Sequence, residues 1–116
     1  MHLYDKAREL AQMIRQSDEM KKLLEAWDTI EKNPANRDLL TNFRNQQMKI
    51  QSYQLMGKTL SEQEVNEYNR SIEAINQVSE IRRYLEAESK LGILIGEIHR
   101  ILGEPLEAMY RDLEAQ

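Results

Sequence analysis

The most informative stretch of this chain is YLEAESKLGILIGEIHRILGEPL, residues 84–106. Leucine and isoleucine recur in it every three or four residues, the spacing that places them on one face of an α-helix. Gly103 and Pro105 follow, and this pair is typical of a helix end, because glycine often caps a helix and proline rarely continues one. The pattern predicts a core helix over residues 80–102, and then a short final helix from Pro105 to Leu113.

Toward the N-terminus, the apolar spacing predicts two more amphipathic helices. The first covers residues 3–16, and the second starts after Ser17, whose side chain can cap it. The second ends before Asn33-Pro34, because the residue before a proline avoids helical angles. No strong breaker separates these two helices, so we expect them to be nearly continuous.

The middle of the chain predicts an antiparallel helical hairpin. Its first helix covers residues 35–56 and ends at Gly57, where glycine suits a left-handed cap. The sequence Ser61-Glu62-Gln63-Glu64 is a capping box, S-x-x-E, at the start of the second helix over residues 62–79. Near Ser79 the apolar positions shift to another face. This shift indicates a break, with Ser79 as a candidate N-cap of the core helix.

Composition favours an all-α fold in a single domain, residues 1–116. Charged residues make up 31% and aromatic residues 6%, with only two prolines and four glycines. The net charge is −4 and there is no basic stripe, which argues against a nucleic-acid site. The chain has no cysteine, which excludes disulfides and thiolate metal sites. No signal core or membrane span is recognisable, so we expect a soluble cytoplasmic protein.

No residue pattern predicts catalysis, a cofactor or a metal. His2 lies at the start of the chain, and His99 has Ile95 and Gly103 at the helical positions where a second metal ligand would stand. Gly57-Lys58-Thr59 lacks the upstream glycine of a phosphate-binding loop, because position 52 is serine. We therefore expect no catalytic, cofactor-binding or metal-binding residues.

Glu88 is the one carboxylate that the sequence singles out. It falls close to the apolar face of the core helix, between Leu85 and Leu91, where a charge is unfavourable unless it is paired. We expect a buried polar residue bonded to a lysine or arginine of a neighbouring helix. The alternative is a specificity element at a helix–helix interface.

Gly92 and Gly96 form a pair of small residues four positions apart in the same helix. Each glycine lowers helix stability by about 1 kcal/mol relative to alanine, so the pair indicates a close backbone approach. The approaching helix is either the first or second helix of the same chain, or a helix of a second subunit.

The far half of the hairpin carries too few apolar residues for a globular core. Between Asn45 and Gln54, asparagine, glutamine and lysine predominate, so the two helices bury only a narrow seam, as in a coiled coil. We expect a protruding arm that packs against a second copy or another protein. The alternative is a compact bundle in which the first or second helix covers the arm. The predicted interface residues are Met48, Ile50, Tyr53, Met56, Val65, Tyr68 and Ile72.

Four segments of the chain resemble the YlbF/YmcA family of small bacterial helical proteins, most closely its YheA-like branch. They are YDKARELAQMIRQSDEMKKL (residues 4–23), NPANRDLLTNFRNQQMKIQ (33–51), MGKTLSEQEV (56–65) and YLEAESKLGILIGEIHRILGEPLE (84–107). The match lies in the order and length of helices rather than in a catalytic motif. The resemblance implies an all-α fold with a long hairpin, self-association and a place in the bacterial cytoplasm.

Better-studied proteins of that family act as non-enzymatic regulators. They form complexes with one another and affect RNA processing by a membrane-anchored ribonuclease, competence, sporulation and biofilm formation. Some of those complexes are linked to iron–sulfur clusters held by cysteines. That feature does not extend to this chain, which has no cysteine.

Our leading hypothesis is therefore a non-enzymatic homo-oligomer, a dimer or larger, that binds a protein partner through the hairpin or the core helix. We expect neither nucleic-acid binding nor membrane insertion. The alternative from another class is a small-ligand or enzyme site in a pocket lined by Tyr84, Glu88 and His99, which requires these polar groups to converge.

Overall fold

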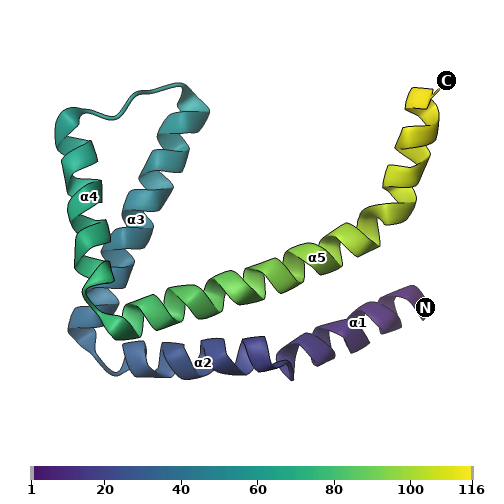
Figure 1. Ribbon diagram of the computed structural model, residues 1–116, viewed down its shortest axis with the longest axis horizontal. Helices are drawn as coiled ribbons and strands as arrows, with labels where there is room; N and C mark the ends of the chain where they lie inside the picture. The colour runs from purple at the N-terminus through teal and green to yellow at the C-terminus, as the bar shows by residue number, and fades with distance from the viewer. Residues whose placement is uncertain (1, 116) are drawn as a thin grey trace.

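The computed structural model describes residues 2–115, which form five α-helices and no strand. The all-α class and the helical hairpin are thereby confirmed. In chain order the helices are α1 (His2–Arg15), α2 (Asp18–Glu31), α3 (Pro34–Met56), α4 (Glu62–Asn76) and α5 (Ser79–Ala115) (Figure 1).

The helices form an open, angular molecule rather than a compact bundle. The helix α2 lies along the first half of α5, and the hairpin of α3 and α4 rises from the end where these two helices meet (Figure 1). The radius of gyration is 19.2 Å, whereas a compact chain of this length has a radius of about 13 Å. Much apolar surface therefore has no partner within the chain.

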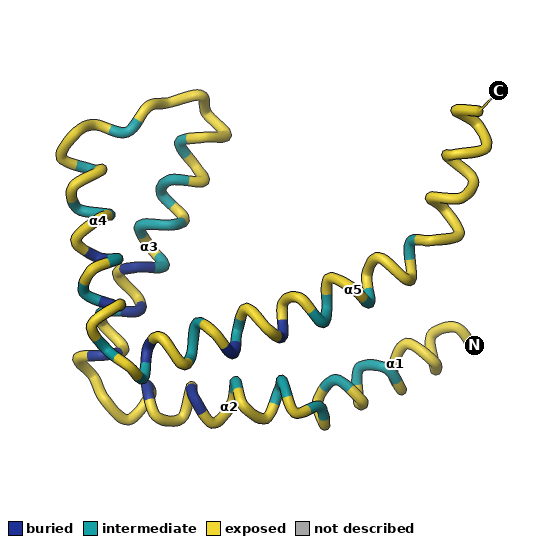
Figure 2. Tube along the Cα trace, viewed as in Figure 1, coloured by how far each residue is buried: buried dark blue, intermediate teal, exposed yellow. Residues whose placement is uncertain are grey.

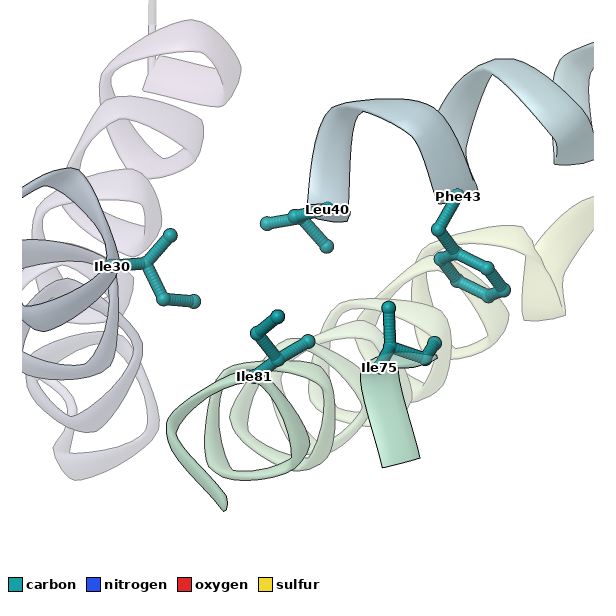
Figure 3. Close-up of a cluster of buried hydrophobic side chains, with 5 residues drawn as sticks. All are labelled: Ile30, Leu40, Phe43, Ile75 and Ile81. Atoms are coloured by element: carbon teal, nitrogen blue, oxygen red, sulfur yellow. The ribbon is translucent and has the colours of Figure 1, made fainter. Parts of the chain in front are cut away.

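The core lies at the junction of α2, α3, α4 and α5. Five buried side chains meet there, with Ile30 and Ile81 fully enclosed (Figure 3). This junction holds the base of the hairpin against the two long helices, and burial decreases away from it in every direction (Figure 2). The cluster consists of Ile30, Leu40, Phe43, Ile75 and Ile81.

The local signals at the helix ends act as expected. The Met20 amide donates to Ser17 Oγ (3.2 Å), which caps α2. Only Gln16 and Ser17 separate α1 from α2, and the two helices run on in nearly the same direction, close to the expected near-continuity (Figure 1). Gly57 has a φ of 69°, the left-handed conformation that glycine adopts without strain. At the start of α4, the Glu64 amide donates to Ser61 Oγ (3.2 Å) and the Ser61 amide donates to Glu64 Oε1 (3.0 Å).

The predicted end of the core helix at Gly103 is wrong. The helix α5 continues through Pro105 to Ala115. Gly103 lies within this helix and does not adopt the left-handed conformation of a C-cap, which among the described glycines is found at Gly57 alone. Proline removes one backbone hydrogen bond and crowds the preceding turn. The helix accommodates this by bending near Pro105 (Figure 1), and the good helix formers that follow extend it.

The break between the hairpin and α5 falls slightly earlier than predicted. The helix α4 ends at Asn76 rather than at residue 79, and α5 begins at Ser79. The Arg82 amide bonds the Val78 carbonyl (3.1 Å), so Ser79 lies in the first turn of α5 and is not its N-cap.

Candidate protein-binding surfaces

The base of the arm formed by α3 and α4 is a packed part of the protein. Phe43 and Tyr68 stack with ring centroids 6.3 Å apart, and Tyr68 and Ile72 lie against the core cluster. These two residues were predicted to lie in an interface, but they are partly covered by the chain's own core. Neither α1 nor α2 covers the far half of the arm, which protrudes (Figure 1).

Polar contacts hold the far half of the arm together. Lys49 of α3 forms an ion pair with Glu64 of α4 (2.8 Å). The Tyr53 ring lies beside Lys49 and Lys58, with ammonium-to-centroid distances of 5.9 and 5.7 Å. Sequence reasoning assigned Glu64 only to the capping box. The sequence does carry a signal for this pair. Residues 49 and 64 lie at nearly equal distances along the chain from the turn at Gly57, and residues equally far from the turn of an antiparallel hairpin lie opposite each other.

This arrangement favours the charged form of Glu64. Its hydrogen bonds from Lys49, from the Ser61 backbone amide and from Tyr53 lower the pKa of Glu64 to about 2. The same contact with Glu64 raises the pKa of Lys49, and it is also the main cause of the raised pKa of Tyr53. The carboxylate is therefore a stabilising tie between α3 and α4, not a general acid or base near neutral pH.

The exposed part of the predicted interface lies toward the tip of the arm. Met48, Met56 and Val65 are exposed, while Ile50 and Tyr53 are half-buried. Leu55, which was not among the predicted interface residues, is 90% exposed, more than any other large apolar side chain of residues 2–115. The tip thus presents methionine and leucine side chains beside a fixed polar network.

Glu88 is tied to the base of the arm. It forms an ion pair with Arg44 of α3, and Arg44 also donates to Gln47 (3.2 Å). The Glu88 side chain is 40% exposed, so the expectation of a buried residue is wrong. One helical turn away, Tyr84 packs on Trp27 of α2 with centroids 5.8 Å apart. Burial, and then the nearby Glu88 carboxylate, raise the pKa of Tyr84.

The predicted small-ligand pocket is not formed. Tyr84 and Glu88 lie beside Arg44, whereas His99 lies about 16 Å further along α5, at 1.5 Å per residue. His99 instead lines a groove between α1 and α5, to which neither Tyr84 nor Glu88 contributes. The convergence of polar groups that this alternative requires is therefore missing.

The groove between α1 and α5 is a concave surface with a mostly apolar lining. Its volume is about 390 Å³, and Lys6 and His99 are its only polar lining residues. The two helices face each other across it without packing closely. Its lining includes Leu3, Ala7, Leu10 and Ile14 of α1, with Ile95 and Ile98 of α5.

The glycine pair on α5 has no close neighbour within the chain. A Cβ atom built on Gly92 or Gly96 would meet nothing within 4 Å. The expected approach of the first or second helix of the same chain is therefore wrong. The approach by a second subunit stays a prediction.

These features define a class of protein: a small all-α chain with a protruding helical hairpin and long apolar helix faces that it does not cover itself. Among residues 2–115 there is no cluster of three or more metal-ligating side chains. No helix in the described part of the chain is long and apolar enough to cross a membrane.

Comparison with known proteins identifies the family. Residues 3–107 match the family described as "Control of competence regulator ComK, YlbF/YmcA", and the chain belongs to this family. A UPF0342 protein of Alkalihalophilus pseudofirmus is 36% identical over 99% of this chain and 98% of its own length. The UPF0342 protein YheA of Bacillus subtilis is 29% identical over 98% of this chain and 97% of its own.

Solved structures share the fold. The structure of Bacillus subtilis YheA superposes with a TM-score of 0.69 and covers 91% of this chain and 96% of its own. Bacillus subtilis RicA, solved in complex with RicF, superposes with a TM-score of 0.65 at 16% identity and covers 91% and 94%. The fold is thus found in a protein that binds another protein.

Proposed function

We propose that this chain is a non-enzymatic regulatory protein of the bacterial cytoplasm, which self-associates and uses its arm to bind a protein partner in a regulatory or RNA-processing complex. The observation that carries this proposal is the amount of exposed surface. The chain exposes 9207 Å², whereas a folded monomer of 13.7 kDa exposes about 6,600 Å².

The difference of about 2,600 Å² per chain exceeds the roughly 800 Å² that each partner buries in a standard interface. Much of this surface is apolar, because large hydrophobic side chains are exposed on α1, on α5 and at the arm tip. Large hydrophobic side chains gathered on an exposed surface are typical of a protein interaction site. The family match and the RicA–RicF complex support the same reading.

The arm supports the role in partner binding. The Lys49–Glu64 pair joins its two helices, and the arm presents Met48, Leu55 and Met56 to solvent. Methionine is common on surfaces that bind partner helices, because its side chain adapts to the opposing shape.

Two measurements test the proposal. Light scattering of the full chain at tens of micromolar should give a mass of at least twice 13.7 kDa; a monomer would contradict self-association. Affinity capture from the native cytoplasm should yield a stoichiometric protein partner that is lost with the double variant Met48→Glu/Met56→Glu. The control is a Lys21→Glu variant, in which an exposed residue of α2 is changed. This variant should keep the partner. Equal capture by both variants would exclude the arm.

A further inference from the structure

The C-terminal part of α5 has an apolar face without a partner. Every described residue from Glu104 to Ala115 is exposed. Leu106, Met109, Tyr110 and Leu113 nevertheless follow the i, i+3, i+4, i+7 spacing of one helix face. The segment continues α5 beyond the bend, but helices in proteins gain most of their stability from tertiary packing of an apolar face. Packing against another surface would supply the missing stability.

The same chain carries a surface that fits this segment. The groove between α1 and α5 extends along α1 from Leu3 to Ile14, a length of about 16 Å, and residues 105–115 span about the same length as a helix. Both surfaces are apolar along their centres, so an apolar stripe would meet an apolar groove.

Charge also favours this pairing. Residues 105–115 carry Glu107, Asp112 and Glu114 against a single base, Arg111. The polar residues lining the groove are Lys6 and His99, and α1 as a whole has three bases against two acids. Opposite charge at the rim of an apolar contact favours the correct orientation.

The segment cannot reach the groove of its own chain without breaking α5. The groove lies beside residues 95–102 of the same helix, and the bend near Pro105 directs the segment away from α1 (Figure 1). A second copy can supply the segment instead. When each copy donates its segment to the other, the two contacts are identical and the assembly closes as a two-fold dimer.

From these observations we infer that the α1–α5 groove is a docking site for residues 105–115 of a second copy of this chain. The inference rests on the self-association proposed above and names the surface that mediates it. It also accounts for the exposed apolar residues of α1 and of the second half of α5, which the arm does not cover.

Disulfide trapping tests the contact directly, because the chain has no cysteine of its own. A chain with Ala11→Cys in the groove is mixed with a chain carrying Met109→Cys in the segment and a size tag. Mild oxidation should give a covalent heterodimer. The matched mixture of Ala11→Cys with Met56→Cys, at the arm tip, should not. Equal trapping in both mixtures, or none with Met109→Cys, would overturn the inference.

A second pair of variants measures the strength of the contact. Met109 and Met56 are similarly exposed, at 50% and 57%, and neither substitution by glutamate should alter helicity. Met109→Glu should weaken self-association roughly thirtyfold or more, as expected for a central interface residue, while Met56→Glu should leave it unchanged.

The possible failures are distinguishable. A wild-type monomer overturns both the inference and the self-association proposed above. A wild-type dimer that is insensitive to Met109→Glu overturns only the docking site. If Met56→Glu weakens that dimer instead, the arm is the self-association surface.

Discussion

Arg44 of α3 and Glu88 of α5 form an ion pair that joins the base of the arm to the long C-terminal helix. The two residues are 44 positions apart in sequence, and their side chains are 35% and 40% exposed. The pair lies beside the Tyr84–Trp27 contact between α5 and α2. It therefore helps to set the angle between the arm and the rest of the molecule.

The Arg44–Glu88 pair should contribute modestly to stability. A double-mutant cycle with Arg44→Met and Glu88→Gln, read from urea unfolding, should give a coupling energy of about 0.5–1 kcal/mol, because solvent reaches both side chains. The Glu86–Lys90 pair on the same helix is more exposed and is the control, with a coupling of about 0.3 kcal/mol. Equal coupling in the two cycles would show that the link to the arm has no special role.

How far the sequence predicts the fold depends on the range of the interactions. The caps at Ser17, Gly57 and Ser61 depend on neighbours within a few residues, and all three are correct. Whether Pro105 ends a helix or bends it depends on the surrounding turns, and there the prediction fails. The sequence indicates that Glu88 needs a cation but cannot name Arg44, because tertiary packing selects the partner.

Of the two candidate binding surfaces, the sequence predicts the arm but not the groove between α1 and α5. The thin apolar seam correctly indicates a protruding arm, since composition alone limits how much the two helices can bury. The groove between α1 and α5 is not predicted, because the apolar faces of both helices look like core positions in the sequence. Only the structure shows that the two faces do not close on each other.

Ile81 should be among the most important residues for stability. Its side chain is fully buried in the core cluster, so Ile81→Ala should lower the free energy of unfolding by about 3 kcal/mol. The control is Ile93→Ala on the same helix, where the side chain is exposed, and it should change stability by less than about 0.5 kcal/mol in the monomer. Urea unfolding at low protein concentration makes the comparison, and similar losses would contradict the assigned core.

Glycine substitutions should have opposite effects at two positions. Gly57 has a φ of 69°, so Gly57→Ala should destabilise the protein by about 1 kcal/mol. Gly92 is helical and has open space where a Cβ would lie, so Gly92→Ala should stabilise the monomer by about 0.5–1 kcal/mol. Thermal unfolding at low concentration measures both. A loss of self-association in Gly92→Ala would indicate that a second subunit approaches there.

The Lys49–Glu64 tie should make part of the stability depend on pH. The pKa of Glu64 is lowered from 4.5 to about 2, so its contribution is fully present above pH 4.5 and is lost as the pH falls toward 2. Glu64→Gln keeps the capping box but removes the charge. The stability difference between wild type and this variant, from urea unfolding between pH 7 and pH 2, should therefore be constant down to about pH 4.5 and then shrink. A difference that does not change with pH would contradict the ion pair.

Hydrogen exchange of the C-terminal amides tests most directly whether a second copy covers the apolar faces of α1 and α5. In an isolated chain, residues 106–115 are all exposed at the end of α5, and an exposed helix end opens and exchanges rapidly. The account predicts that these amides exchange slowly in concentrated wild-type protein, and that protection is lost on dilution or with Met109→Glu. Exchange at unstructured rates in concentrated wild-type protein would contradict it.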